Sequence, residues 1–389
     1  MITKINRRQL IVLSIIICQL YSSVALFTSC VNDDTDFSAY TNAQTESPTA
    51  ADTILIAYNG NTASVSGDRN SLVSVSGADV TVNDPTSART MVLVLSGTTN
   101  NGSLLVYRSL KYEIVLKGVS ITNADGPAIN NQCGKALHIT CADGTVNTLT
   151  DGTVYTEQSY DQKGTLFSEG QIYFQGMGTL NVNGNSKNGI ASDDYIIFRD
   201  GTINVNVAAT GSNGVKVNDG FTIEGGTLNI DVSADGARGI RNGARTIIAG
   251  GNATITTSGG CSIETIDGIV DTTSCAGIKS DSLFTMTAGT LTITSTGDGG
   301  KGINCSENIE LSGGTLTVTT TGDNVLGKPK ALKSDTGIIV SGGSLTARVE
   351  KSWACDNGTD SDEPEDHITI IGTPLTPPTL TKKLVKVVF

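Results

Sequence analysis

The sequence has few aromatic residues, few prolines and few histidines. Aromatic residues make up 5% of the 389 positions, and the chain has 8 Pro, 2 His and 1 Trp. So few rings argue against a broad aromatic platform for stacking on sugars. His138 lies near Cys133 in the sequence, but no second pair of ligands follows at metal spacing, so zinc has weak support.

Positive charge is also scarce. The chain has 26 Lys and Arg against 38 Asp and Glu, and removal of residues 1–29 leaves 23 basic residues against the same 38. This balance makes nucleic acid a poor partner. Such a surface suits divalent cations or neutral ligands unless the basic residues gather on one face.

Glycine is abundant instead, with 45 residues, and Thr, Ser, Asn and Val are frequent. This usage is typical of strands and turns, so we expect almost no helix after the first 29 residues. A chain of this length with 38% hydrophobic residues can bury a continuous core.

The hydrophobic run near the amino terminus, Leu10–Ile17, is too short for a membrane span and follows a basic start. Residues 1–29 therefore predict a lipoprotein signal peptide. The segment ends in LFTSC, Leu26–Cys30, which resembles a bacterial lipoprotein cleavage box with Cys30 as the lipidated residue. Plain secretory cleavage nearby is the alternative.

Residues 30–51 are rich in Asp, Thr, Ser and Ala and predict a flexible tether. Asp33, Asp34 and Asp36 resemble the acidic tag of bacterial lipoproteins that reach the outer cell surface. We therefore expect an outer-membrane lipoprotein exposed at the cell surface. A solvated linker without a targeting role is the alternative for these carboxylates.

Two short sequence segments, which we call the first and the second line, recur from Gly178 onward. The first is GGTLTVTT at Gly313–Thr320, and its copies open at Gly178, Gly201, Gly225, Gly250, Ala288 and Gly342. The second line precedes each copy and carries Gly189, Gly214, Gly239, Gly277, Gly302 and finally Ala331, in steps of 25, 25, 38, 25 and 29 residues. A period near 25 predicts a solenoid, and the step of 38 contains an insertion of about 13 residues.

Within each unit, apolar residues alternate with Thr, Ser, Asn and Glu, which predicts strands. Because units of equal length repeat, we predict an all-β fold: a single-stranded, right-handed parallel β-helix, a solenoid with capped ends. A β-sandwich of hairpins does not explain the full-unit period. The β-helix predicts one interior column of stacked side chains: Ile190, Val215, Ile240, Ile278, Ile303 and Leu332.

The β-helix domain is predicted to span residues 52–389 of a monomer. Residues 52–110 lack the period and predict an amino-terminal cap, and residues 111–350 hold the rungs. Residues 351–389 hold an acidic loop and a carboxyl-terminal cap, because open solenoid ends need cover.

Six cysteines remain once Cys18 and Cys30 are set aside. Cys261 and Cys275 bracket the insertion and are predicted to close it as a disulfide in an oxidising compartment. The sequence leaves the pairing of the others open: Cys133, Cys141, Cys305 and Cys355.

These rung lines, with GVSITNADGPAI at Gly118–Ile129 and VNTLTDG at Val146–Gly152, resemble a known family. It is the bacterial carbohydrate-binding β-helix domain first described in a cellulolytic clostridium as a cellulose and pectin binder. The resemblance covers about residues 53–371. It implies a right-handed β-helix, bound calcium, affinity for acidic plant polysaccharide such as polygalacturonate, and kinship in shape with pectate lyases.

Two exposed columns are predicted beside the buried one. The basic column holds Lys216, Arg241, Lys279 and Lys333, with Ala191 and Asn304 as interruptions. The acidic column holds Asp193, Asn218, Asp281 and Asp335, with Gly243 and Ser306 as interruptions. The two columns can simply neutralise each other. Alternatively, the basic column binds uronate carboxylates while Asp193, Asp281 and Asp335 hold calcium.

The loop CDNGTDSDEPEDH offers further oxygen ligands at Asp356, Asp360 and Asp362. Oxygen ligands beside a glycine turn suit calcium, although the spacing is not that of an EF-hand. A solvated acidic loop is the alternative.

We predict a surface-anchored protein that binds polysaccharide without cleaving it, and assign no catalytic residue. One alternative is a calcium-dependent, pectate-type lyase, with Lys216 or Lys279 as the base beside Asp193 or Asp281. The other alternative is an adhesive or structural surface solenoid.

Overall fold

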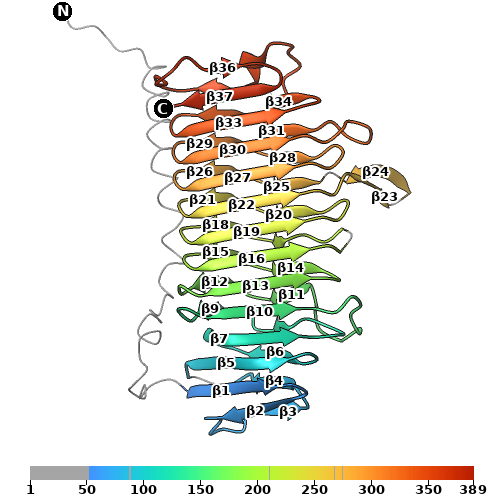
Figure 1. The fold of residues 1–389 in the computed structure, drawn as a ribbon, viewed down its shortest axis with the longest axis vertical. Helices are drawn as coiled ribbons and strands as arrows, with labels where there is room; N and C mark the ends of the chain where they lie inside the picture. The colour runs from blue at the N-terminus through green and yellow to red at the C-terminus, as the bar shows by residue number, and fades with distance from the viewer. Residues whose placement is uncertain (1–51, 87–88, 210, 267, 274) are drawn as a thin grey trace, which may run out of the picture. The chain divides into compact units, whose positions relative to one another are not determined.

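The computed structural model describes residues 52–389 except 87–88, 210, 267 and 274. The predicted signal peptide, the tether and Cys30 lie outside the described residues. The described chain forms a parallel β-solenoid of about 11 turns, which confirms the predicted fold class (Figure 1). In this part of the chain, no helix is long and apolar enough to span a bilayer.

From residue 129 onward, each full turn of the solenoid contributes one strand to each of three faces. The first face contains β3 (Val73–Ser76), β4 (Asp79–Asp84), β6 (Ser103–Arg108), β8 (Ile129–Asn131), β11 (Gly164–Ser168), β14 (Asn188–Ser192), β17 (Val215–Val217), β20 (Arg238–Asn242), β25 (Ala276–Ser280), β28 (Lys301–Cys305), β31 (Lys330–Ser334) and β34 (Trp353–Asp356). The second face contains β9 (Leu137–Cys141), β12 (Ile172–Gln175), β15 (Tyr195–Phe198), β18 (Gly220–Ile223), β21 (Thr246–Ile248), β26 (Phe284–Met286), β29 (Ile309–Leu311), β32 (Ile338–Val340) and β35 (Thr369–Ile370).

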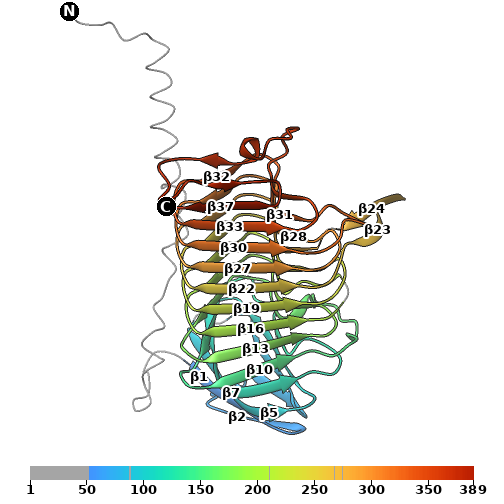
Figure 2. The same cartoon turned by 45° about the horizontal axis from the view of Figure 1, so that its top comes forward.

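The third face contains the long strands that carry the first repeated line (Figure 2). They are β10 (Val146–Thr150), β13 (Thr179–Gly184), β16 (Thr202–Val207), β19 (Thr227–Val232), β22 (Asn252–Thr257), β27 (Thr290–Ser295), β30 (Thr315–Thr320), β33 (Ser344–Val349) and β37 (Leu384–Val388). Every neighbouring pair from β10 to β33 is parallel and in register, whereas β33 and β37 are antiparallel.

Parallel pairing starts earlier than the sequence predicts. β1 (Asp52–Asn59) pairs in parallel with β5 (Met91–Thr99), and β5 with β7 (Tyr112–Thr122), although residues 52–110 were expected to form only a cap. Antiparallel cover at this end comes from β2 (Thr62–Ser66) and β3. At the other end, β36 (Thr379–Leu380) and β37 close the solenoid, after the 3₁₀ turn Pro364–His367.

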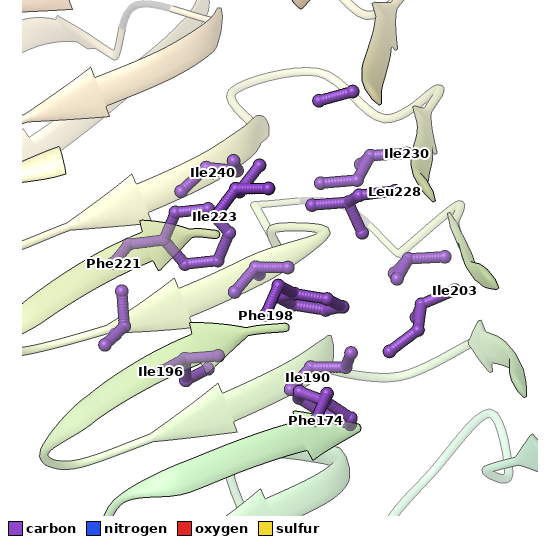
Figure 3. Close-up of a cluster of buried hydrophobic side chains, with 14 of the residues drawn as sticks. Phe174, Ile190, Ile196, Phe198, Ile203, Phe221, Ile223, Leu228, Ile230 and Ile240 are labelled. Atoms are coloured by element: carbon purple, nitrogen blue, oxygen red, sulfur yellow. The ribbon is translucent and has the colours of Figure 1, made fainter. Parts of the chain in front are cut away.

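The predicted interior column is confirmed. Ile190 pairs with Val215, and the register continues through Ile240, Ile278 and Ile303 to Leu332. All six side chains are at most 1% exposed. Figure 3 shows Ile190 and Ile240 inside the turns together with buried side chains of the other faces, including Phe198.

The repeated glycines of the second line are explained by the space available. A Cβ atom on Gly189, Gly214, Gly239, Gly277 or Gly302 would lie 2.0–2.4 Å from a Val or Ile methyl group of the third face. In each case that partner comes 16 residues later: Val205, Ile230, Ile255, Ile293 and Val318. Ala331 replaces glycine in the last copy, and the residue 16 positions later is the smaller Ala347.

The insertion predicted between Gly239 and Gly277 forms a hairpin rather than an extra solenoid turn. β23 (Ser262–Ile266) and β24 (Ile269–Thr273) pair antiparallel and leave the solenoid on one side (Figure 1). Gly268 adopts a φ of +77° between the two strands, a conformation that suits glycine in a tight turn.

Candidate functional site

The basic column lies on the outer side of the first face, where Lys216 is exposed as predicted and Arg241, Lys279 and Lys333 are half-buried. Lys216 pairs in register with Arg241, and Arg241 with Lys279. Asn304 then separates Lys279 from Lys333. Adjacent strands lie about 4.8 Å apart, so Lys216, Arg241 and Lys279 place three cationic side chains on three consecutive turns.

The acidic column lies close enough to neutralise most of this positive charge. Arg241 Nη2 is 2.5 Å from Asp281 Oδ2, and Lys279 Nζ is 3.4 Å from the other oxygen of the same carboxylate. Lys333 forms an ion pair with Asp335. Three of the four predicted ligand-binding cations therefore already have a carboxylate partner.

Lys216 differs from the other three cations. Its side chain is exposed, and in the described part of the chain it has no ion pair or hydrogen bond. It lines a shallow hollow of about 310 Å³ together with Asn188, Ser212, Asn213 and the exposed Lys187. The one cation of the column that is free to bind a ligand therefore faces a hollow.

A second hollow of about 490 Å³ adjoins the first, and both are lined by Gln162, Lys163 and Lys187. It lies under the loop of residues 151–163, which brings Tyr155 and Tyr160 to its wall. Sequence reasoning missed these residues because the loop lies outside the repeat. The length of this loop between two segments that are predicted to be strands is the sequence feature that could have revealed it.

The loop is held in place by a buried carboxylate. Asp151 is 2% exposed and accepts hydrogen bonds from the Asn185 backbone N–H at 2.6 Å and from the Tyr155 hydroxyl at 2.7 Å. Burial raises the pKa of Asp151, although these hydrogen bonds partly offset that effect. Lys187 Nζ donates to the Gln162 carbonyl at 2.7 Å and lies 5.2 Å from the Tyr155 ring centroid. The hollow is therefore pre-organised.

The predicted calcium ligands do not form a free set of oxygen atoms. Asp193 is ion-paired with Lys163. Asp281 is ion-paired with both Arg241 and Lys279, and Asp335 with Lys333. Asp356 is paired with Lys330 at 2.8 Å and Asp362 with Lys382 at 2.9 Å, while Asp360 is exposed.

One group of three carboxylates in the described residues has ligand atoms within 4.8 Å of one another: Asp161, Glu169 and Asp193. Lys163 Nζ lies 2.5 Å from Asp161 and is also bonded to Asp193. This ammonium group supplies the cation that the carboxylates would otherwise attract. The residues therefore do not fit a preformed calcium site, and we derive no step through calcium.

Cys261 and Cys275 meet at the base of the β23–β24 hairpin. Both thiols are buried, and a hydrogen bond between them lowers the pKa of Cys261 and raises that of Cys275. The structure contains them as thiols. Their contact is compatible with the predicted disulfide, which stays a prediction.

Comparison with known proteins agrees with the fold. A family model described as carbohydrate-binding domain-containing protein matches residues 76–239 and 233–327. A solved structure of a polysaccharide lyase-like protein from C. thermocellum, a gadolinium derivative, is similar with a TM-score of 0.52. The two sequences are 25% identical over 68% of this chain and 96% of that chain. No curated protein matches significantly.

The family model covers more than half of the chain, from the first turns of the solenoid to the turn before β31. The interior column from Ile190 to Ile303 and the register of these rungs lie within the same residues. The chain therefore belongs to the carbohydrate-binding domain-containing protein family.

Proposed function

We propose that the protein binds an acidic polysaccharide along the basic column of the first face without cleaving it. The observation that carries this proposal is the stacking of Lys216, Arg241 and Lys279 on three consecutive turns. A uronate polymer presents carboxylates repeatedly along an extended chain, and such contacts add along its length.

Binding begins at Lys216 in this proposal, because its ammonium group has no anionic partner to displace. Carboxylates of the ligand then compete with Asp281 for Arg241 and Lys279. Exposed ion pairs contribute about 0–1 kcal/mol each, so single contacts are weak and a polymer is bound better than a monosaccharide.

Retardation in an affinity gel that contains polygalacturonate tests the proposal. The triple variant Lys216→Gln, Arg241→Gln and Lys279→Gln should migrate faster than the parent through this gel, relative to a gel without polymer. A matched control, Arg69→Gln, Lys117→Gln and Arg245→Gln, removes the same charge at exposed residues elsewhere. Equal retardation of the two variants would show that the basic column is only structural.

The same samples address calcium and lyase activity. Addition of a chelator shows whether retardation requires calcium, which the family resemblance implies. Formation of an unsaturated uronide, followed by its ultraviolet absorbance, would indicate the alternative of a lyase. A solenoid with only an adhesive or structural role would give neither retardation nor product.

We also propose that Cys30 carries a lipid anchor that holds the protein at the outer membrane. The basis is the LFTSC segment after a basic and apolar leader. The Cys30→Ala variant should move from the membrane fraction to the soluble fraction of the cells that make it. If the variant stays with the membranes to the same degree as the parent, the anchor proposal is wrong.

A further inference from the structure

A second group of basic side chains lies at the carboxyl-terminal end of the solenoid. We call Arg348, Lys351, Lys383 and Lys386 the C-terminal basic cluster. They line a hollow of about 760 Å³ and are all exposed. Arg348 lies on β33, Lys386 lies on β37, and Lys351 and Lys383 lie beside these strands.

The positive charge of the C-terminal basic cluster is mostly uncompensated. Lys351 lies 3.5 Å from Asp323, and both side chains are exposed. Within the described residues, Arg348, Lys383 and Lys386 form no ion pair, and Glu350 is the one acidic residue in the lining of the hollow. This contrasts with the basic column, where Arg241, Lys279 and Lys333 have carboxylate partners.

The backbone fixes the relative positions of these side chains. β33 and β37 pair antiparallel with Thr346 opposite Lys386 and Arg348 opposite Leu384. The Val349 N–H donates to the Lys383 carbonyl at 3.0 Å, which holds the start of β37 against the end of β33. The half-buried Leu384 contributes an apolar part to the lining of the hollow.

On the third face, the three preceding turns place no charged side chain in line with Arg348. Arg348 continues an outward column whose preceding members are Thr256, Thr294 and Thr319. The cluster therefore gathers four cations in a chain whose formal net charge is −12. Two like charges about 4 Å apart repel by about 1 kcal/mol even in water, and a bound anion removes that repulsion.

We infer that the C-terminal basic cluster binds the anionic groups of a saccharide and forms a contact separate from the basic column. The assignment of the ligand as a saccharide rests on the proposed function. The anionic group of the ligand is a carboxylate or a sulfate on a sugar ring, because the ammonium group of lysine and the guanidinium group of arginine bind both. Leu384 can then contact the apolar edge of the ring.

The experiment compares three triple variants in gels that contain polygalacturonate or dextran sulfate. The cluster variant carries Arg348→Gln, Lys383→Gln and Lys386→Gln, and the other two are the basic-column variant and the matched control described above. Loss of three exposed ion pairs should weaken binding by about tenfold. Equal melting temperatures of the variants and the parent show that the fold is kept.

The inference predicts that the cluster variant loses about tenfold in affinity in at least one gel while the matched control does not. The gel in which this happens identifies carboxylate or sulfate as the group bound. If the cluster variant behaves like the matched control in both gels, the inference is wrong. In that case, loss of retardation by the basic-column variant would still support the proposed function. If the parent is not retarded in either gel, both are wrong.

Discussion

At the scale of single residues, the glycines of the second repeated line are set by the opposite wall of the solenoid. Gly277 has room for a hydrogen atom only, because a Cβ atom there would lie 2.3 Å from Ile293 Cγ2. A close-packed interior has no space for an added methyl group. The last copy shows the complementary solution, with Ala331 in a turn whose third-face residue is Ala347.

This packing predicts the outcome of a double-mutant cycle. Gly277→Ala should lower the free energy of unfolding by about 1–3 kcal/mol through overpacking. In the Ile293→Ala background the same change should cost less, because the clashing methyl group is gone, so the two changes should be non-additive. The measurement is the urea midpoint of each variant.

The matched control for this cycle is Gly134→Ala, because a Cβ atom there has no neighbour within 4 Å. It should leave the urea midpoint nearly unchanged. Additive effects of Gly277→Ala and Ile293→Ala would contradict the packing account of the repeated glycines.

At the scale of elements, the sequence was sufficient wherever the rungs repeat. Alternation of apolar residues predicted the strands, and the period near 25 aligned Ile190 with Val215 and Lys216 with Arg241. These predictions succeed because parallel in-register stacking turns one sequence offset into a spatial neighbour.

The elements outside the repeat were harder to predict. The insertion that forms the hairpin β23–β24 is about half as long as one rung. Only its turn residues distinguish a hairpin from an added strand. The early parallel pair β1 and β5 is separated by the intervening strands β2, β3 and β4, so no fixed period marks it. In both places a local pattern of alternation is compatible with more than one pairing.

The candidate site was predicted only in part for the same reason. The basic and acidic columns follow from the repeat, but the partners of each carboxylate depend on side-chain directions that a sequence does not fix. Lys163 meets Asp193 across one turn, and the antiparallel closure of β33 by β37 places Lys386 opposite Thr346, two residues before Arg348. These contacts join segments that share no repeat position.

At the scale of the whole molecule, the notable feature is the distribution of positive charge. In a chain with a formal net charge of −12, cations without an ion pair among the described residues line two hollows: Lys187 with Lys216 in one, and Arg348, Lys383 and Lys386 in the other. On the first face, neighbouring carboxylates neutralise Arg241, Lys279 and Lys333. This distribution favours an anionic ligand held at a few points over a general attraction to anions.

The most direct test of acidic polysaccharide binding compares polygalacturonate with the same polymer after complete methyl esterification, at increasing salt concentration. Esterification removes the charge and keeps the sugar backbone. The account predicts binding to the charged polymer that weakens as salt screens the ion pairs, and little binding to the ester. Equal, salt-independent binding to both polymers would contradict it, because the ligand would then be recognised through its neutral sugar surface.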